Sequence, residues 1–159
     1  MDKLWAPWRI GYISKVCKGS KANLFRRILK SDNDKENYVI IRYEHAFAVL
    51  NIYPYNNGHI LVLPNRSVKD TRELKPVEKQ NLFELVDEVK DLLDEVLEPG
   101  GYNVGMNIGR AAGAGIPEHL HVHIVPRWDG DGLTVSKWVP VQGNMEQIGR
   151  IADKIKKKI

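Results

Sequence analysis

Hydrophobic residues in the first half of the chain gather in short runs that predict β-strands. Residues 38–44 (YVIIRYE) and 46–51 (AFAVLN) are rich in β-branched and aromatic residues, and a single residue separates them, which predicts a hairpin. The turn YPYNNG leads into a third run at 59–64 (HILVLP). Pro64 should end that strand, because proline has no N–H to donate to a central ladder. The three runs predict an antiparallel meander.

The apolar positions change to a helical period in the middle of the chain. Within residues 76–97, leucines and valines recur three or four positions apart with charged residues between them, which predicts one long amphipathic helix lying on the sheet. Pro76 suits its first turn, and the PGG sequence that follows should end it. Shorter helices are expected at about 21–30 and 144–158.

Two more strands are predicted after the long helix. Residues 102–109 (YNVGMNIG) form the first of them, and residues 119–128 (HLHVHIVPRW) form the second. A glycine-rich loop, GRAAGAGIPE, joins the two. No internal repeat or linker divides the chain.

Length and composition indicate one domain. The 159 residues are 43% hydrophobic, which is enough for a single buried core. We therefore expect one domain over residues 1–159, with its core at about 36–128, an N-terminal extension at 1–35 and a C-terminal tail at 129–159. The lone Cys17 excludes an intrachain disulfide and a zinc site built on CxxC pairs.

The N-terminal sequence and the net charge indicate where the protein is located in the cell and what it can bind. There is no run of eighteen apolar residues, and MDKLWAPWRI lacks the features of a secretory signal, so we expect a cytoplasmic protein that does not enter a membrane. The net charge is +4, and residues 1–30 hold eight Lys or Arg against Asp2 alone, which fits an anionic partner. The basic segments lack the interleaved aromatic residues of a single-strand binding surface, so nucleic acid is not expected.

Three of the five histidines alternate along the last predicted strand. His119, His121 and His123 should point to one face, whereas the apolar residues between them should point to the other face and meet the long helix. Burying three unpaired imidazoles would be costly. The histidine face is therefore predicted to line a polar site.

Two chemical roles fit this cluster. The outer histidines would be ~13 Å apart along a strand, so one zinc with bonds of about 2.0–2.1 Å could hardly hold all three, although two of them with His59 or His45 could bind a metal. The favoured interpretation is a histidine nucleophile, because an imidazole with a pKa near 6.5 is largely neutral at cellular pH. The glycine-rich loop could turn its backbone N–H groups toward a phosphate, and Asn107 before it could donate to a phosphate oxygen or cap the turn.

The combined segment NIGRAAGAGIPEHLHVHIVPRW resembles the signature of the histidine triad (HIT) family, in which three alternating histidines follow a glycine-rich turn. The upstream segment FAVLNIYPYNNGHILVLP resembles the strand–turn–strand unit of that family. LWAPWRIGYI resembles the opening of a branch related to diadenosine polyphosphate hydrolases and phosphorylases. The resemblance covers residues 4–13 and about 36–128.

The resemblance implies an α+β fold, with an antiparallel sheet of about five strands, one long helix and short helices. It also implies a homodimer that binds a nucleotide, most simply an adenine nucleotide, in each subunit and needs no metal or cofactor. His121 matches the nucleophile that attacks the α-phosphorus. The remaining matched positions contact phosphate oxygens and the leaving side (His123, Asn107), orient the nucleophile (His119, His59), contact ribose (Asn51) or offer backbone phosphate donors (Gly115, Ile116).

The sequence departs from the branch in two places. Members often carry a zinc-binding CxxC pair where ISKVCKGSK keeps only Cys17, so structural zinc is not expected and His45 is left as a structural residue. The segment LTVSKWVPVQGN differs from the tail expected of the phosphorylases, which leaves the choice of substrate open. Trp5 and Trp8 fit either the core or a clamp near the site.

Three functions fit these residues. The leading hypothesis is a nucleotidyl hydrolase or transferase that acts on a dinucleoside polyphosphate, or a related phosphoramidate or phosphate conjugate, through a nucleotidyl-histidine. The alternatives are a nucleotide-binding or signalling module with slow turnover and a metal-dependent phosphohydrolase.

Overall fold

The structure is a computed structural model that describes residues 23–129 and 145–158. Several sequence predictions lie outside the described residues, namely those on Trp5, Trp8, Cys17 and the segment LTVSKWVPVQGN.

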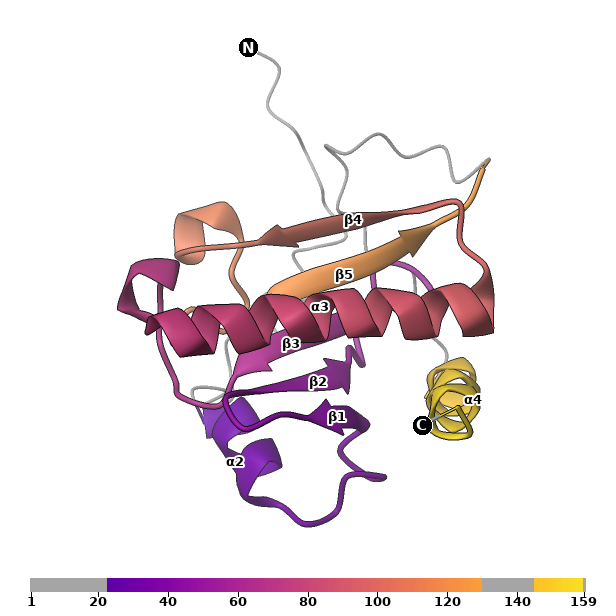
Figure 1. Ribbon diagram of the computed structural model, residues 1–159, viewed down its shortest axis with the longest axis horizontal. Helices are drawn as coiled ribbons and strands as arrows, with labels where there is room; N and C mark the ends of the chain where they lie inside the picture. The colour runs from indigo at the N-terminus through magenta and orange to yellow at the C-terminus, as the bar shows by residue number, and fades with distance from the viewer. Residues whose placement is uncertain (1–22, 130–144, 159) are drawn as a thin grey trace.

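Five antiparallel strands form one sheet in the order β1-β2-β3-β5-β4 (Figure 1). The first three strands are the predicted meander, and the last strand inserts between β3 and β4. The α+β class and the sheet of five strands are thus confirmed. The strands are β1 (Val39–Arg42), β2 (Ala46–Leu50), β3 (Ile60–Pro64), β4 (Gly101–Met106) and β5 (Val122–Arg127).

The long helix α3 (Pro76–Leu97) has the predicted bounds and lies across one face of the sheet (Figure 1). Its apolar stripe packs on the inward side chains of β2, β3 and β5, and α4 (Met145–Lys156) adds a second layer beside α3 and β1. Glu78 fixes the start of α3, because its carboxylate accepts hydrogen bonds from the Arg66 guanidinium and from the Lys75 N–H. The Arg66 guanidinium lowers the pKa of Glu78 to about 2.

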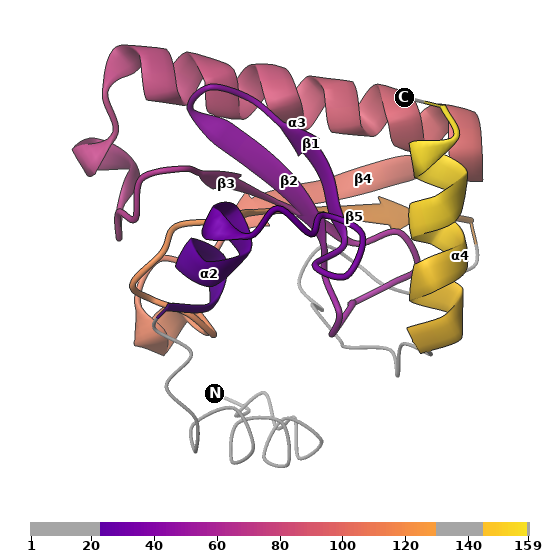
Figure 2. The same cartoon turned by 90° about the horizontal axis from the view of Figure 1, so that it is seen from below.

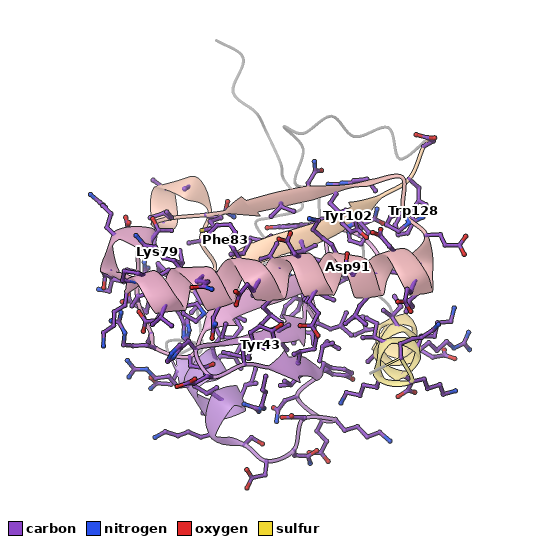
Figure 3. The ribbon with its side chains drawn as sticks, viewed as in Figure 1. Tyr43, Lys79, Phe83, Asp91, Tyr102 and Trp128 are labelled. Atoms are coloured by element: carbon purple, nitrogen blue, oxygen red, sulfur yellow. The ribbon has the colours of Figure 1, made fainter. Side chains whose placement is uncertain are left out.

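Two tyrosines tie α3 to the sheet from opposite sides of the helix (Figure 3). The Tyr43 hydroxyl donates to Glu88, and the Tyr102 hydroxyl donates to Asp94 at 2.6 Å. Hydrogen bonding to the Glu88 carboxylate raises the pKa of Tyr43 to about 12. Both edges of the sheet are therefore hydrogen-bonded to the same helix.

The opposite face of the sheet carries a smaller apolar cluster. The short helix α2 (Leu24–Lys30), within the predicted 21–30 segment, lies on the other side of the sheet from α3 (Figure 2). Its Phe25 and Ile28 pack with five strand residues, Val39, Phe47, Val49, Leu61 and Leu63. The molecule thus has an extensive core under α3 and a second face on which a site can form.

One predicted strand begins later than expected. The sequence predicted a strand from His119, but β5 begins at Val122, so that prediction is wrong for the first three residues. The ladder with β3 ends at the Val62–Val122 pair, because the following Leu63 and Pro64 approach the end of β3 and Pro64 lacks an N–H. The Leu120 N–H instead donates to the Val68 carbonyl at 2.6 Å.

Short 3-10 turns connect the remaining elements, at η2 (Thr71–Glu73) before α3 and η3 (Arg110–Ala112) in the glycine-rich loop. Within the described ranges, no helix is both long and apolar enough to cross a bilayer.

Candidate active site

Four buried histidines meet at the start of β5, on the face of the sheet opposite α3. His119 and His121 come from the segment directly before β5, His123 from β5, and His59 from the turn before β3. Their exposed fractions lie between 0% and 7%. The ring centroids of His121 and His123 are 4.9 Å apart and those of His59 and His123 are 5.1 Å apart. The structure therefore brings the predicted His59 and the three alternating histidines into one cluster.

The backbone fixes which nitrogen of His121 carries its hydrogen. The Nδ1 atom lies 2.8 Å from the His119 carbonyl oxygen, and a carbonyl can only accept. Nδ1 is therefore the donor, and the lone pair of the neutral ring is on Nε2. Burial lowers the pKa of His121, although the hydrogen bond to the His119 carbonyl opposes this shift, so the ring is neutral at pH 7.

A second backbone group, the Tyr55 N–H, determines which ring nitrogens of His59 and His123 carry a hydrogen. The Tyr55 N–H donates to His59 Nδ1 at 3.0 Å, so His59 Nε2 carries the ring hydrogen. This nitrogen donates to His123 Nδ1 at 2.9 Å, which leaves the His123 hydrogen on Nε2. Burial, together with the neighbouring histidine rings, lowers the pKa of His59 far below its usual value and that of His123 to about 3.

His119 connects the end of β3 to His121. Its Nε2 donates to the Pro64 carbonyl at 2.7 Å, at the end of β3, and its own carbonyl accepts from His121. Burial lowers the pKa of His119 against the opposing effect of the bond to Pro64. His119 thus links the end of β3 to the orientation of His121.

Two aromatic side chains enclose the cluster, and the sequence analysis identified neither. Tyr55 stacks on His59 with ring centroids 4.8 Å apart, and its ring lies 5.6 Å from that of His123. Phe25 of α2 lies 5.5 Å from the His119 ring and 5.7 Å from the His121 ring. The turn YPYNNGH placed Tyr55 near His59 in the sequence, whereas no sequence signal connects Phe25 to the histidines.

Two predicted nucleotide-binding asparagines, Asn51 and Asn107, differ in what connects them to the histidines. The Asn51 amide Nδ2 lies 3.2 Å from His59 Nδ1, and its Oδ1 accepts from the Tyr53 N–H. Asn107 directly follows β4, whose last residue Met106 pairs with Val122, so Asn107 lies at the same end of the sheet as the site. Asn51 therefore lies beside the histidine cluster, and Asn107 lies at the same end of the sheet.

The glycine-rich loop has the expected left-handed positions. Gly109 and Gly113 have φ of 84° and 89°, which a residue with a side chain rarely adopts. Gly115 is exposed and Ile116 is half-buried, and the Ile116 carbonyl accepts from the His119 N–H at 3.2 Å. This bond connects the loop directly to the first residue of the triad.

The described residues do not assemble a metal site. Among residues 23–129 and 145–158, no group of three or more His, Cys, Asp or Glu side chains could hold a metal ion. Four ring nitrogens of the cluster take part in hydrogen bonds, either between His59 and His123 or with the Pro64 and His119 carbonyl groups. His45 lies beside Glu44, 3.7 Å from its carboxylate.

Comparison with known proteins identifies the family. The HIT domain matches residues 32–130, which include β1 to β5 and all four site histidines. The chain belongs to the HIT family. Phe25 and the rest of α2 precede the matched residues of the HIT domain.

Sequence relatives and solved structures that are similar to this chain include further histidine triad proteins and nucleotide-cleaving enzymes. The HIT chain is 38% identical over 138 residues to the AP-4-A phosphorylase of Mycobacterium tuberculosis, covering 82% of this chain and 70% of that protein. It is 33% identical over 114 residues to the asymmetrical bis(5'-nucleosyl)-tetraphosphatase of Schizosaccharomyces pombe, covering 69% and 62% of the two chains. A zinc-bound histidine triad protein from Mycobacterium smegmatis superimposes with a TM-score of 0.69 at 26% identity, covering 88% and 96%.

Proposed function

We propose that this HIT protein is a nucleotidyl hydrolase or transferase that cleaves dinucleoside polyphosphates at the α-phosphate. The observation that carries the proposal is the hydrogen bond from His121 Nδ1 to the His119 carbonyl. This bond leaves a lone pair on Nε2 of a neutral ring, which is the form in which an imidazole acts as a nucleophile.

The first chemical step joins His121 to the nucleotide. The Nε2 lone pair forms a bond to the α-phosphorus while the bond from that phosphorus to the bridging oxygen breaks, and the leaving nucleoside polyphosphate keeps the electron pair. The His121 ring then carries a positive charge, and its Nδ1–H remains bonded to the His119 carbonyl, which stabilises that charge. In the second step, water or inorganic phosphate displaces the nucleotidyl group from Nε2.

The neighbouring histidines take supporting roles in this proposal. His123 presents its Nε2 hydrogen to an oxygen on the leaving side, and His59 holds His123 in that tautomer. His119 orients the nucleophile through its carbonyl. Asn107 donates to a phosphate oxygen, and the backbone of Gly115 and Ile116 supplies further phosphate donors.

Asn51 is proposed to contact the ribose. Its position beside His59 supports this role, because a sugar bound there would place the attached phosphate next to the histidines. Positioning the phosphorus in line with Nε2 supplies much of the rate gain in a reaction of this type.

The hydrogen bonds of His123 favour polyphosphate over amine leaving groups. A neutral His123 whose Nδ1 accepts from His59 is a hydrogen-bond donor at Nε2 but a poor source of a proton at pH 7. A nucleoside polyphosphate leaves as a stable anion and needs no proton, whereas the amine of a phosphoramidate does. The names of the phosphorylase and tetraphosphatase relatives agree with this substrate class.

We also infer that the protein is a cytoplasmic homodimer. In the described part of the chain, β4 pairs with β5 alone, so its other edge offers free backbone groups to a second copy. Exposed apolar side chains lie around that edge, and Phe83 projects from α3 on the β4 side (Figure 3). Val104 of β4 and Ile108, two residues after the end of that strand, are also exposed. The single cysteine fits a reducing compartment.

The function is tested by mixing the protein with diadenosine tetraphosphate and measuring both products and protein mass. We expect ATP release together with an added AMP on the protein, insensitive to chelator. Water as the acceptor then gives AMP, and added inorganic phosphate gives ADP, so the nucleotide products distinguish hydrolysis from phosphorolysis.

His121→Ala is the matched variant for this test. It should lose the adduct and turnover while it still binds nucleotide, because the other site residues remain. Turnover at the parental rate in His121→Ala would overturn the proposal. Loss of turnover to chelator would favour a metal-dependent enzyme, and binding without any turnover would favour a signalling module.

A further inference from the structure

Helix α2 brings one aromatic side chain against the first two histidines of the triad. The Phe25 ring is 5% exposed and meets the His119 ring edge-on, with an interplanar angle of 79°. The same ring lies tilted at 51° against His121. Phe25 therefore occupies space into which the His121 ring would otherwise rotate.

Arg42 of β1 holds α2 in this position. Its guanidinium donates to three carbonyls at the end of the helix, those of Ile28, Leu29 and Ser31, at 3.1–3.2 Å. The same guanidinium pairs with the Asp34 carboxylate at 2.6 Å. A helix of seven residues without a side-chain N-cap bond is not stable alone, so these bonds and the packing of its apolar face set its place.

We propose that Phe25 is a positioning residue for the nucleophile and that Arg42 acts through it. Phe25 limits the orientations of the His121 ring and excludes water from the part of the ring that it covers, so that Nε2 stays directed at the phosphate. This inference rests on the proposed function of His121, and it concerns residues that precede or flank the site rather than any group that touches the reacting atoms.

Phe25 is the α2 side chain whose ring lies against His121. The titratable groups around the ring are His119 and His123 on its own segment and His59 from the turn before β3, and Arg26 of α2 acts on His119. Burial is the largest cause that lowers the pKa of His121. Removing the Phe25 ring admits water, which raises that pKa toward 6.5.

The test compares Phe25→Leu with Phe47→Leu. Phe47 is fully buried in the same apolar cluster, and in the described residues it makes no ring contact with a histidine. The readouts are the single-turnover rate of AMP transfer to His121 across pH, the KM, and the titration of the His121 ring by nitrogen NMR. Phe25→Met, which keeps more of the volume, serves if Phe25→Leu does not fold.

In Phe25→Leu we expect the maximal transfer rate to fall by about tenfold or more, with KM nearly unchanged, since misorientation acts on the chemical step. The acid limb of the rate and the NMR titration of His121 should both move toward pH 6.5. Phe47→Leu should lower stability but keep the parental rate and acid limb.

Arg42→Gln tests whether Arg42 acts through Phe25. Releasing α2 should reproduce the rate loss and the shift of the acid limb while Phe25 is still present. In the double variant with Phe25→Leu, the loss of transfer rate should be far smaller than the product of the two single losses. Both substitutions remove the same contact between Phe25 and His121.

A parental rate and parental His121 titration in a folded Phe25→Leu or Phe25→Met variant would overturn the inference. Multiplicative losses in the double variant would contradict the role of Arg42. Failure of the proposed function looks different, because the parental protein would then form no adduct on His121 while the NMR titration would still report the contact with Phe25.

Discussion

His121, His119 and His59 each face a main-chain group that cannot exchange the roles of donor and acceptor. The carbonyls of His119 and Pro64 accept, and the N–H of Tyr55 donates. The fold itself, rather than the solution pH, thus selects the tautomer of every ring in the cluster. The prediction that His121 carries a nucleophilic nitrogen depends on this selection.

For a single residue, we predict that His59→Ala lowers both the stability and the transfer rate. The substitution leaves the Tyr55 N–H and His123 Nδ1 without their present partner, so the free energy of unfolding should fall by about 1–3 kcal/mol. The transfer rate should fall by about 10- to 100-fold, because His123 is no longer held in its tautomer. Urea unfolding and rapid-quench kinetics measure the two effects.

His45→Ala is the control, since His45 lies outside the cluster. We expect a change within about 0.5 kcal/mol and a parental rate. Equal losses in the two variants would show that the His59–His123 bond has no special role.

At the scale of elements, a single turn places His59 opposite β5. Gly58 precedes His59 with φ of 76°, and a Cβ at this position would overlap the Leu97 side chain at the end of α3. The backbone of this turn therefore favours glycine at position 58.

Gly58→Ala should accordingly lower both stability and activity. Strain at positive φ together with the overlap should cost more than about 1 kcal/mol, and the shifted turn should displace His59. Thermal unfolding and the transfer rate measure these effects. Gly101→Ala, where an added Cβ meets nothing within 4 Å, should leave both near the parental values, and a similar loss there would refute the explanation.

The helices and strands also show which structural features the sequence patterns can predict. The period of α3 and the proline at each of its boundaries predicted its bounds, and the apolar runs predicted the meander, because both signals are local. The start of β5 was predicted too early, since alternation says nothing about where a partner strand ends. Phe25 could not be predicted as a site residue, because its contact with His121 joins distant segments and follows no spacing rule.

At the scale of the whole molecule, four neutral histidines are buried together between the sheet, α2 and the turn that carries Tyr55. The folded state lowers the pKa of each of them. Unfolding returns each ring to a pKa near 6.5. Below that pH the unfolded chain takes up protons that the folded chain excludes.

The protein should therefore lose stability as the pH falls. The contribution of the four rings is fully present above pH 6.5 and decreases progressively below it, until each folded-state pKa is reached. Each ring should add up to about 1.4 kcal/mol per pH unit to the slope. Urea unfolding at pH 7.5, 6.5 and 5.5 measures it, and a free energy of unfolding that stays constant from 7.5 to 5.5 would contradict the burial of neutral rings.

The nucleophilic role of His121 is tested most directly by locating the nucleotidyl group on the protein. Protein labelled with nitrogen-15 in histidine is mixed with diadenosine tetraphosphate, quenched rapidly in alkali, and analysed by fragment mass and by phosphorus–nitrogen coupling. If His121 is the nucleophile, AMP is found on His121, bonded through Nε2. AMP on another residue, or on Nδ1 of His121, would contradict it.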